Sequence, residues 1–268
     1  VKGATGAGAF GGGGVAVNGA VSLLVNRQKV NTFVGRGVIL TAEELDVLAN
    51  AATEAKAVLI GVTGGGVAVS LSAAVAIVEP TILTFVGATP SGFGTVAGAE
   101  AASAGRITVD FLSIENDVDS TAVSTVLSVA GGGVAVNGNV LLVFNRTRAV
   151  AGLTRANVKA IRNIFINALM DSDARSFILA ATAGGVAVGV TVSYVHLRSM
   201  NDALVDLTNA EVSATNLYVY AGKVDDRNSA TALSIALAAN IGAISVGVNS
   251  AIADNNARNN ARIIGSGV

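Results

Sequence analysis

The sequence is poor in several residue types on which cores and chemical sites usually depend. Its 268 residues include no cysteine and no tryptophan, two prolines and a single histidine. Without cysteine, disulfide bonds and thiolate sites are excluded. Aromatic residues make up only 4% and charged residues only 13% of the chain, so the aromatic platforms and clustered acids of a carbohydrate-cleaving protein are not expected.

Charge is low and balanced. The 17 basic and 18 acidic residues give a net charge of −1 and form no long runs. A nucleic-acid-binding chain normally carries a basic patch or stripe, so no nucleic-acid partner is expected. Hydrophobic residues, in contrast, make up 51% of the chain, and the mean hydropathy is +0.62. A chain this apolar can bury enough surface to fold, which excludes intrinsic disorder.

Two apolar stretches, 57–78 and 230–253, are long enough to be compared with membrane helices. Both contain glycines and alternate strictly, as in Gly66–Ser72. Alternation is the period of a β-strand rather than of a helix, so membrane spanning is not expected. The sequence starts at Val1, with no charged region ahead of an apolar one, and we expect it to be a mature piece or part of a longer chain.

The strongest feature is an internal repeat. A motif of the form Gly-Val-Ala-Val-Asn returns five times, and its second residue serves as an anchor in each copy. The anchors are Val15, Val67, Val134, Val186 and Ile244, with spacings of 52, 67, 52 and 58 residues. Repeats of this period are typical of solenoids and tandem arrays. We interpret 1–268 as a single repeat array, with units near 12–63, 64–130, 131–182, 183–240 and 241–268.

Each anchor opens a stretch in which large and small side chains alternate. The small face repeats as Ala16, Ala68, Ala135, Ala187 and Ser245. Period-2 order indicates β-strands, and identical motifs favour in-register stacking. The sequence therefore predicts an all-β protein, a parallel β-helix or β-solenoid built from about five repeats of 52–67 residues. We expect the five anchors to stack as one inward column.

The rest of each unit is also interpreted as strand, although Thr41–Leu45 has the Thr-x-x-Glu pattern of a helix start. Runs of glycine, such as Gly131–Gly133, are interpreted as tight corners that need positive φ or close approach. The extra residues of the 67-residue unit predict a loop insertion at 88–105. Apolar rows at 58–62 and 233–237 would form too large a bare patch for a soluble monomer. We expect them to be buried against another part of the chain or another subunit.

Residues with chemical potential are few, and the sequence predicts no catalytic, cofactor-binding or metal-binding residue and no cofactor. His196 occupies a column that is apolar in the first three units, which favours a structural role. The acidic pairs Asp117/Asp119 and Asp171/Asp173 lack the spacing of a calcium loop and are interpreted as solvated turns. Twelve residues past the anchors, stacking predicts a charge ladder formed by Arg27, Glu79, Arg146 and Arg198.

Strands of the form Val-x-Val, followed by Asn-x-x-x-Ala-x-Ile, are clearest at Gly185–Val205 and Gly242–Ile263. This pattern resembles the repeats of giant bacterial surface adhesins of the filamentous-haemagglutinin and leukotoxin-like type. The resemblance covers the repeat core and implies a parallel β-helix that is exported across the outer membrane and forms a long stalk or fibre. It transfers no catalytic residue. Family coils are often shorter than these units, so one unit is either one wide coil or two narrower ones.

These patterns together favour a non-enzymatic structural segment of an extracellular fibre or adhesin stalk that self-assembles through stacked β-strands. Its expected place is the cell surface. Its expected partners are further copies of itself and a host or neighbouring-cell surface. Two alternatives are left open: a β-helical carbohydrate-binding or carbohydrate-cleaving protein such as a tailspike, and an outer-membrane β-barrel, although a barrel needs interfacial aromatic girdles.

Overall fold

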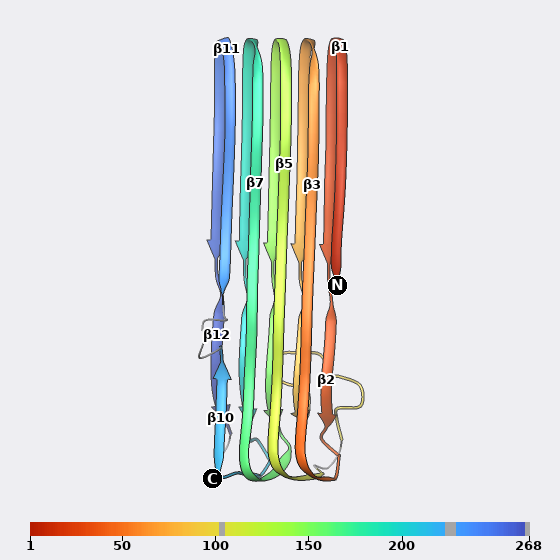
Figure 1. Ribbon diagram of the computed structural model, residues 1–268, viewed down its shortest axis with the longest axis vertical. Helices are drawn as coiled ribbons and strands as arrows, with labels where there is room; N and C mark the ends of the chain where they lie inside the picture. Colours follow the sequence, from red (N-terminus) through yellow and green to blue (C-terminus); the bar gives the residue numbers. More distant parts are fainter. Residues whose placement is uncertain (102–104, 223–228, 266–268) are drawn as a thin grey trace.

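The computed structural model describes residues 1–101, 105–222 and 229–265, and this part of the chain is built from parallel strands without a helix (Figure 1). The predicted all-β parallel solenoid is confirmed. The strands are β1 (Lys2–Asn26), β2 (Lys29–Gly35), β3 (Leu40–Val78), β4 (Thr81–Gly87), β5 (Arg106–Asn145), β6 (Arg148–Thr154), β7 (Asn157–Leu197), β8 (Met200–Asp206), β9 (Val212–Ser213), β10 (Asn216–Ala221), β11 (Ala230–Asn255) and β12 (Arg258–Ile264).

Each coil is one wide, flattened loop of chain. In the second coil, β3 climbs one face, folds over at Gly64–Gly66 and returns down the other face, where β4 continues it. We call the limb that leads up to the glycines the ascending arm, the limb that returns from them the descending arm, and the glycine turn the apex. The half of each arm that is nearer to the apex is called distal, and the other half is called proximal. The long strands form one sheet in the order β1-β3-β5-β7, which β9, β10 and β11 complete, and the short strands form another, β12-β8-β6-β4-β2.

Stacking follows the register of the repeat. The five anchors pair with one another across neighbouring strands in the order Val15, Val67, Val134, Val186 and Ile244. The expected inward orientation of this column is wrong, however. Val15 is 72% and Ile244 62% exposed, whereas the neighbouring Ala68 and Ala135 are fully buried. The small face, and not the large one, lines the interior.

The reason is the narrow gap between the two arms in the distal half. A methyl group placed on Gly61 of the ascending arm would lie 3.2 Å from the hydroxyl oxygen of Ser72 on the descending arm. Only small side chains fit at this level near the apex, whereas Leu59, Leu141 and Ile178 are fully buried farther from it in the same half. Lower down the arms diverge, and Leu112, Ile114 and Ile164 form a conventional core with Leu153 of β6. The proximal half therefore holds most of the large buried side chains.

The glycine runs form the apices, where backbones of successive coils approach closely. A Cβ atom on Gly132 would lie 2.1 Å from the carbonyl oxygen of Gly65, and one on Gly65 would lie 2.2 Å from that of Gly13. Real Cβ atoms do not come so close, so these corners require glycine. Thr41–Leu45, with its resemblance to a helix start, lies within β3.

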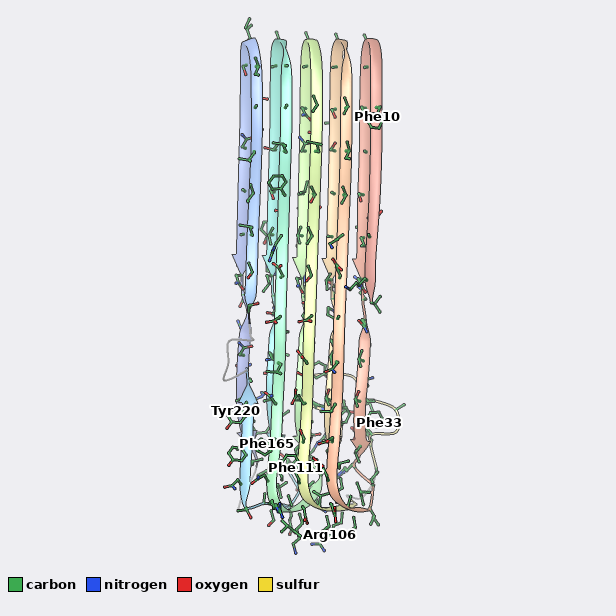
Figure 2. The ribbon with its side chains drawn as sticks, in the orientation of Figure 1. Phe10, Phe33, Arg106, Phe111, Phe165 and Tyr220 are labelled. Carbon is green, nitrogen blue, oxygen red and sulfur yellow. The ribbon has the colours of Figure 1, made fainter. Side chains whose placement is uncertain are left out.

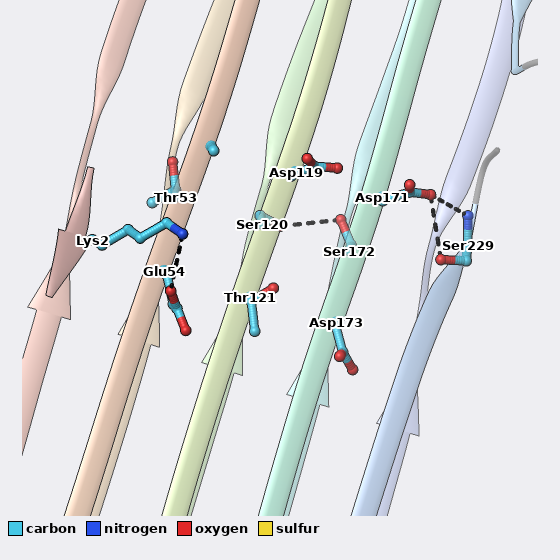
Figure 3. Close-up of a pocket in the computed structure, with 11 residues that line it drawn as sticks. Lys2, Thr53, Glu54, Asp119, Ser120, Thr121, Asp171, Ser172, Asp173 and Ser229 are labelled. Atoms are coloured by element: carbon cyan, nitrogen blue, oxygen red, sulfur yellow. Dashed lines mark hydrogen bonds and ion pairs between the residues drawn. The ribbon is translucent and has the colours of Figure 1, made fainter. Parts of the chain in front are cut away.

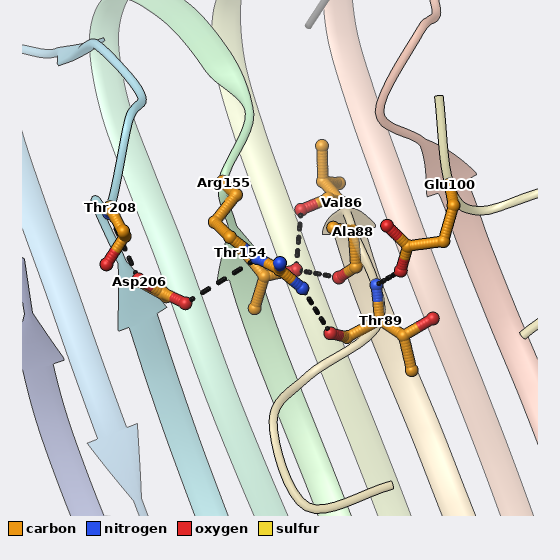
Figure 4. Close-up of polar contacts among 8 residues, drawn as sticks. All are labelled: Val86, Ala88, Thr89, Glu100, Thr154, Arg155, Asp206 and Thr208. Atoms are coloured by element: carbon orange, nitrogen blue, oxygen red, sulfur yellow. Dashed lines mark hydrogen bonds and ion pairs between the residues drawn. The ribbon is translucent and has the colours of Figure 1, made fainter. Parts of the chain in front are cut away.

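The insertion expected at 88–105 is irregular over the described residues 88–101 and 105, and 102–104 lie outside the described residues. It turns back onto the descending face, where Val96 and Ala99 bury Leu83 and Phe85 of β4. Polar contacts anchor it (Figure 4). The guanidinium of Arg155 donates to the carbonyl of Thr89 at 2.9 Å, and the amide of Thr89 donates to the carboxylate of Glu100 at 2.9 Å. The loop thus covers proximal apolar surface.

Aromatic side chains gather in the proximal half of the ascending face (Figure 2). Phe111 and Phe165 lie on neighbouring strands with ring centroids 5.3 Å apart, and Tyr218 stacks on Phe165 at 4.5 Å. Pairs at these separations add modestly to the free energy of stacking, about 0.5–1.5 kcal/mol each. They help to hold the third, fourth and fifth coils in register.

Candidate functional site

The most unusual surface is the distal half of the descending arms, whose outward side chains are almost all apolar. In the third coil these are Val134, Val136, Val140, Leu142 and Phe144, and the other coils place mostly valine, leucine and isoleucine at the paired positions. All five are exposed or half-buried. We call this surface the distal descending face. A contiguous apolar patch of this kind usually marks an interaction site.

The ascending arms carry a second, shorter apolar surface. Val58, Ile60 and Val62 are exposed, while Leu59 between them is fully buried. Leu233 and Leu237 are exposed on the last coil, with Ile235 half-buried. The expectation that another part of the chain buries these rows is wrong, since in the described residues the sheet simply presents them outward. Burial against another subunit stays a prediction.

The distal interior is mixed, because Leu59, Leu141 and Ile178 form a buried cluster with alanines and buried asparagines, serines and threonines alternate with them. Asn145 of the descending arm donates from its amide nitrogen to the carbonyl oxygens of Ser120 and Asp173, at 3.1 and 3.0 Å. Asn26 binds in the same way to the carbonyls of Val1 and Glu54, at 3.0 and 3.1 Å. Each asparagine ties its own coil to the next one and joins the two arms. In the sequence these asparagines directly precede the residues of the charge ladder. The alternation of side chains does not reveal that their amides bind backbone carbonyls of two neighbouring coils.

Some interior hydroxyls make no hydrogen bond in the described part of the chain, among them Thr63, Ser70, Ser72 and Ser124. A buried hydroxyl without a partner costs free energy, about 1–3 kcal/mol each. The distal half thus combines an interior of mostly small, partly polar side chains with an apolar exterior. Burial of apolar area within one chain therefore contributes less to this half than to the proximal half.

The charge ladder lies at the lower margin of the distal descending face. Glu79 accepts from Arg27 at 2.8 Å and from Arg146 at 3.1 Å, so it sits between two arginines on adjacent coils. Arg198 follows on the next coil and lines a hollow with Arg146, Arg148 and Met200. Exposed ion pairs of this kind contribute only about 0.2–1 kcal/mol each. The row nevertheless separates the bare apolar surface from the loop-covered surface below it.

His196 belongs to the same surface. Its Nδ1 atom lies 2.9 Å from the carboxylate of Asp254 on the next coil, and its ring packs beside Phe144 and Tyr194. The contacts with Asp254 and Phe144 follow the stacking direction, whereas Tyr194 lies two residues away on the same strand. The geometry assigns His196 to the ladder between coils rather than to a cluster of reactive groups.

Acidic residues gather on the ascending face, at a shallow hollow lined by Glu54, Asp119, Asp171 and Asp173 (Figure 3). The interpretation of Asp117/Asp119 and Asp171/Asp173 as turns is wrong, because both pairs lie within the long strands β5 and β7. They alternate outward there, where carboxylates keep their water. Within the described ranges, no three acidic or histidine side chains are grouped closely enough to hold a metal ion.

Basic neighbours compensate part of this acidic surface. Lys2 lies 3.8 Å from Glu54, and Lys56 forms a closer ion pair with the same carboxylate. The hydrogen bond and charge of Lys56 lower the pKa of Glu54 despite partial desolvation. Asp171 accepts from the backbone amide of Ser229 at 2.9 Å. Glu54 and Asp171 therefore link neighbouring coils, whereas Asp173 pairs with Arg175 of its own strand.

Comparison with known proteins adds no relative. No helix in the described ranges is long and apolar enough to cross a membrane. The inference of function therefore rests on features of the structure itself, which are the in-register coils, the two apolar distal faces and the charged margins. No protein-family model, curated protein or solved structure matches this chain.

Proposed function

We propose that this chain is a non-enzymatic structural segment of an extracellular fibre or adhesin stalk, which grows by stacking coils edge to edge at the cell surface. The observation that carries the proposal is the in-register parallel stack, in which each coil repeats the hydrogen-bonding pattern of the previous one. A stack of this kind has no built-in end, because every coil presents the same template to the next.

The two end coils support this reading. In the described residues β1 pairs only with β3, and β11 pairs only with β7, so the backbone groups on the far side of each strand can pair with a further coil, either of a longer chain or of another copy. Long, flat and apolar edges are templates for addition of another strand. An edge of β1 that accepts the β11 edge of another copy would continue the same register and would need no new kind of contact.

The test is imaging of the purified chain by electron microscopy, with solution mass measured over a range of concentrations. We expect filaments whose length grows with concentration. A monodisperse monomer at micromolar concentration would refute self-assembly, and a compact, discrete particle would contradict the fibre.

A matched pair of variants tests the edge itself. Glu54 donates its amide proton to Val1, so the even-numbered residues of this arm of β1 direct their amide protons to the open edge. Proline at Ala4 and Gly8 removes two of these donors without touching the β1–β3 ladder. We expect A4P/G8P to shorten or abolish filaments and the control A4S/G8S to retain them. Equal filament length in both would contradict edge addition.

A further inference from the structure

The distal descending face has the dimensions of a protein–protein interface. It extends from Val134 to Phe144 along each arm, about 34 Å, and across five strands, about 24 Å. The resulting area is roughly 800 Å² per copy, which is what one partner contributes to a stable interface of standard size. Its centre holds no charge, and Arg27, Glu79 and Arg146 lie along its margin. An apolar centre with a polar rim is the usual anatomy of such interfaces.

The loop 88–101 determines how a partner can approach. It lies directly below the charge ladder, over Leu83 and Phe85, and its Phe93 ring packs under the guanidinium of Arg148 at 4.6 Å. The proximal part of the descending face is therefore already covered by the chain, while the distal part is bare. A flat partner can lie against the distal part only if it does not extend over the loop.

A second copy of this chain meets that condition in one arrangement. When two distal descending faces meet with their apices pointing in opposite directions, each apex ends near the other copy's charge ladder, and both loops lie outside the contact. With apices pointing the same way, the loops would collide and Arg146 would face Arg146. Stacking a descending face on another copy's ascending face would place the loop between the sheets when the apices point the same way, and would reverse the stacking direction of the second copy when they point in opposite directions. Of the arrangements that keep one stacking direction, only the antiparallel contact of two descending faces leaves the arginines in water.

We infer that the distal descending face is the contact between two copies of this chain, related by a two-fold axis along the stacking direction. This inference deepens the proposed function and rests on it, because it makes the fibre a pair of protofilaments joined face to face. Rotation about that axis keeps the stacking direction of both copies the same, so both expose corresponding edges at the same end. Lateral pairing and edge growth are therefore compatible.

The first test measures solution mass in the edge-blocked A4P/G8P chain, where filament growth does not obscure a dimer. Val140 lies at the centre of the proposed contact and is 42% exposed, and Val129 lies on the ascending face of the same coil and is 39% exposed. We expect V140E to weaken the dimer roughly tenfold or more, as removal of a central contact usually does. V129E should leave it unchanged, and circular dichroism should show both variants folded.

The second test uses the absence of native cysteine. Face-to-face sheets lie about 10 Å apart, a distance that a short bismaleimide spans. In a mixture of V134C and F144C chains we expect cross-links between position 134 of one copy and position 144 of the other. Cross-links of V134C with itself, or with V129C, would overturn the antiparallel arrangement.

The outcomes separate this inference from the proposed function. Filaments that persist while V140E and V129E have equal effects would overturn the lateral contact and leave edge growth intact. A wild-type chain that stays monomeric at micromolar concentration overturns both. A chain that inserts into phosphatidylcholine vesicles in place of dimerising would assign the apolar face to lipid and overturn the second copy as its occupant.

Discussion

Adjacent residues on opposite faces of one strand provide the most direct test of which face is inside. Val134 is 39% exposed and Ala135 is fully buried. In the first coil, a Cβ atom on Gly11 would already lie 3.7 Å from the Cβ of Ala16 across the gap, and the register replaces Gly11 by Ala130 in the third coil. The substitution Ala135→Val adds two methyl groups to this filled space.

Overpacking of this kind costs about 1–3 kcal/mol, because the two arms must separate or the side chain must leave its preferred rotamer. Val134→Asp, in contrast, keeps its carboxylate in water and should lower the free energy of unfolding by about 1 kcal/mol or less, mainly through strand propensity. An inward Val134 would give the opposite order, since a buried unpaired carboxylate costs several kcal/mol.

The assay is urea unfolding followed by circular dichroism, with A4P/G8P/V140E as background, so that neither edge growth nor the contact between distal descending faces enters the measured stability. Ala135→Ser serves as the matched control, since the register places a serine, Ser245, in the same column in the fifth coil. A larger loss of stability in Val134→Asp than in Ala135→Val would refute the assignment of the small face to the interior.

Three further perturbations follow from the contacts described above. Asn145→Ala should lower the free energy of unfolding by about 1–3 kcal/mol, because it removes buried hydrogen bonds from the Asn145 amide to the backbone carbonyls of Ser120 and Asp173. Urea unfolding measures this loss, and an unchanged midpoint would contradict the tie between the arms. Replacing 88–105 by a short connection should leave the coil folded, as measured by circular dichroism, but less stable. Leu83 and Phe85 would become exposed, which costs about 1.5–3 kcal/mol each. Loss of the strand signal would show that the loop is required for folding. The bond from the Thr89 amide lowers the pKa of Glu100 below its ordinary value of 4.5, so its anchoring contribution is complete above pH 4.5 and is lost as the pH falls through the lowered pKa. Limited proteolysis of the loop should accelerate over that range in the wild type, whereas Glu100→Gln should cleave at a rate independent of pH there.

The repeat made the stacking register predictable from the sequence. Val15, Val67 and Val134 pair as their alignment requires, because identical alternating segments have one register in which every side chain meets its equivalent. The strand assignment of Thr41–Leu45 was predictable for the same reason, since its counterparts in later coils lack helical features.

The side of the sheet that faces inward could not be predicted from period alone. Both faces of these strands carry apolar or small residues, and the rule that large apolar side chains go inside favours the wrong one. The gap between the arms decides, and it depends on pairs such as Gly61 and Ser72 that lie opposite each other across the apex. Polar residues on the alanine face, such as Asn18 and Asn137, were the available signal, because they bind backbone carbonyls inside the coil.

Because side chains alternate strictly along the arms, the face on which each residue lies depends on the number of residues that precede it in the arm. Loss of one residue between Val134 and Asn145 would shift every following position to the opposite face, bringing valines into a gap sized for alanine and turning the asparagines away from the carbonyls they bind. At the proximal connections this alternation is interrupted, and there the chain accommodates an entire loop between β4 and β5 while the arms on either side remain paired residue for residue. Insertions and deletions in arrays of this kind should therefore accumulate where strand pairing is interrupted, as at the proximal connections and between β10 and β11, whereas continuously paired stretches of the arms should diversify by substitution.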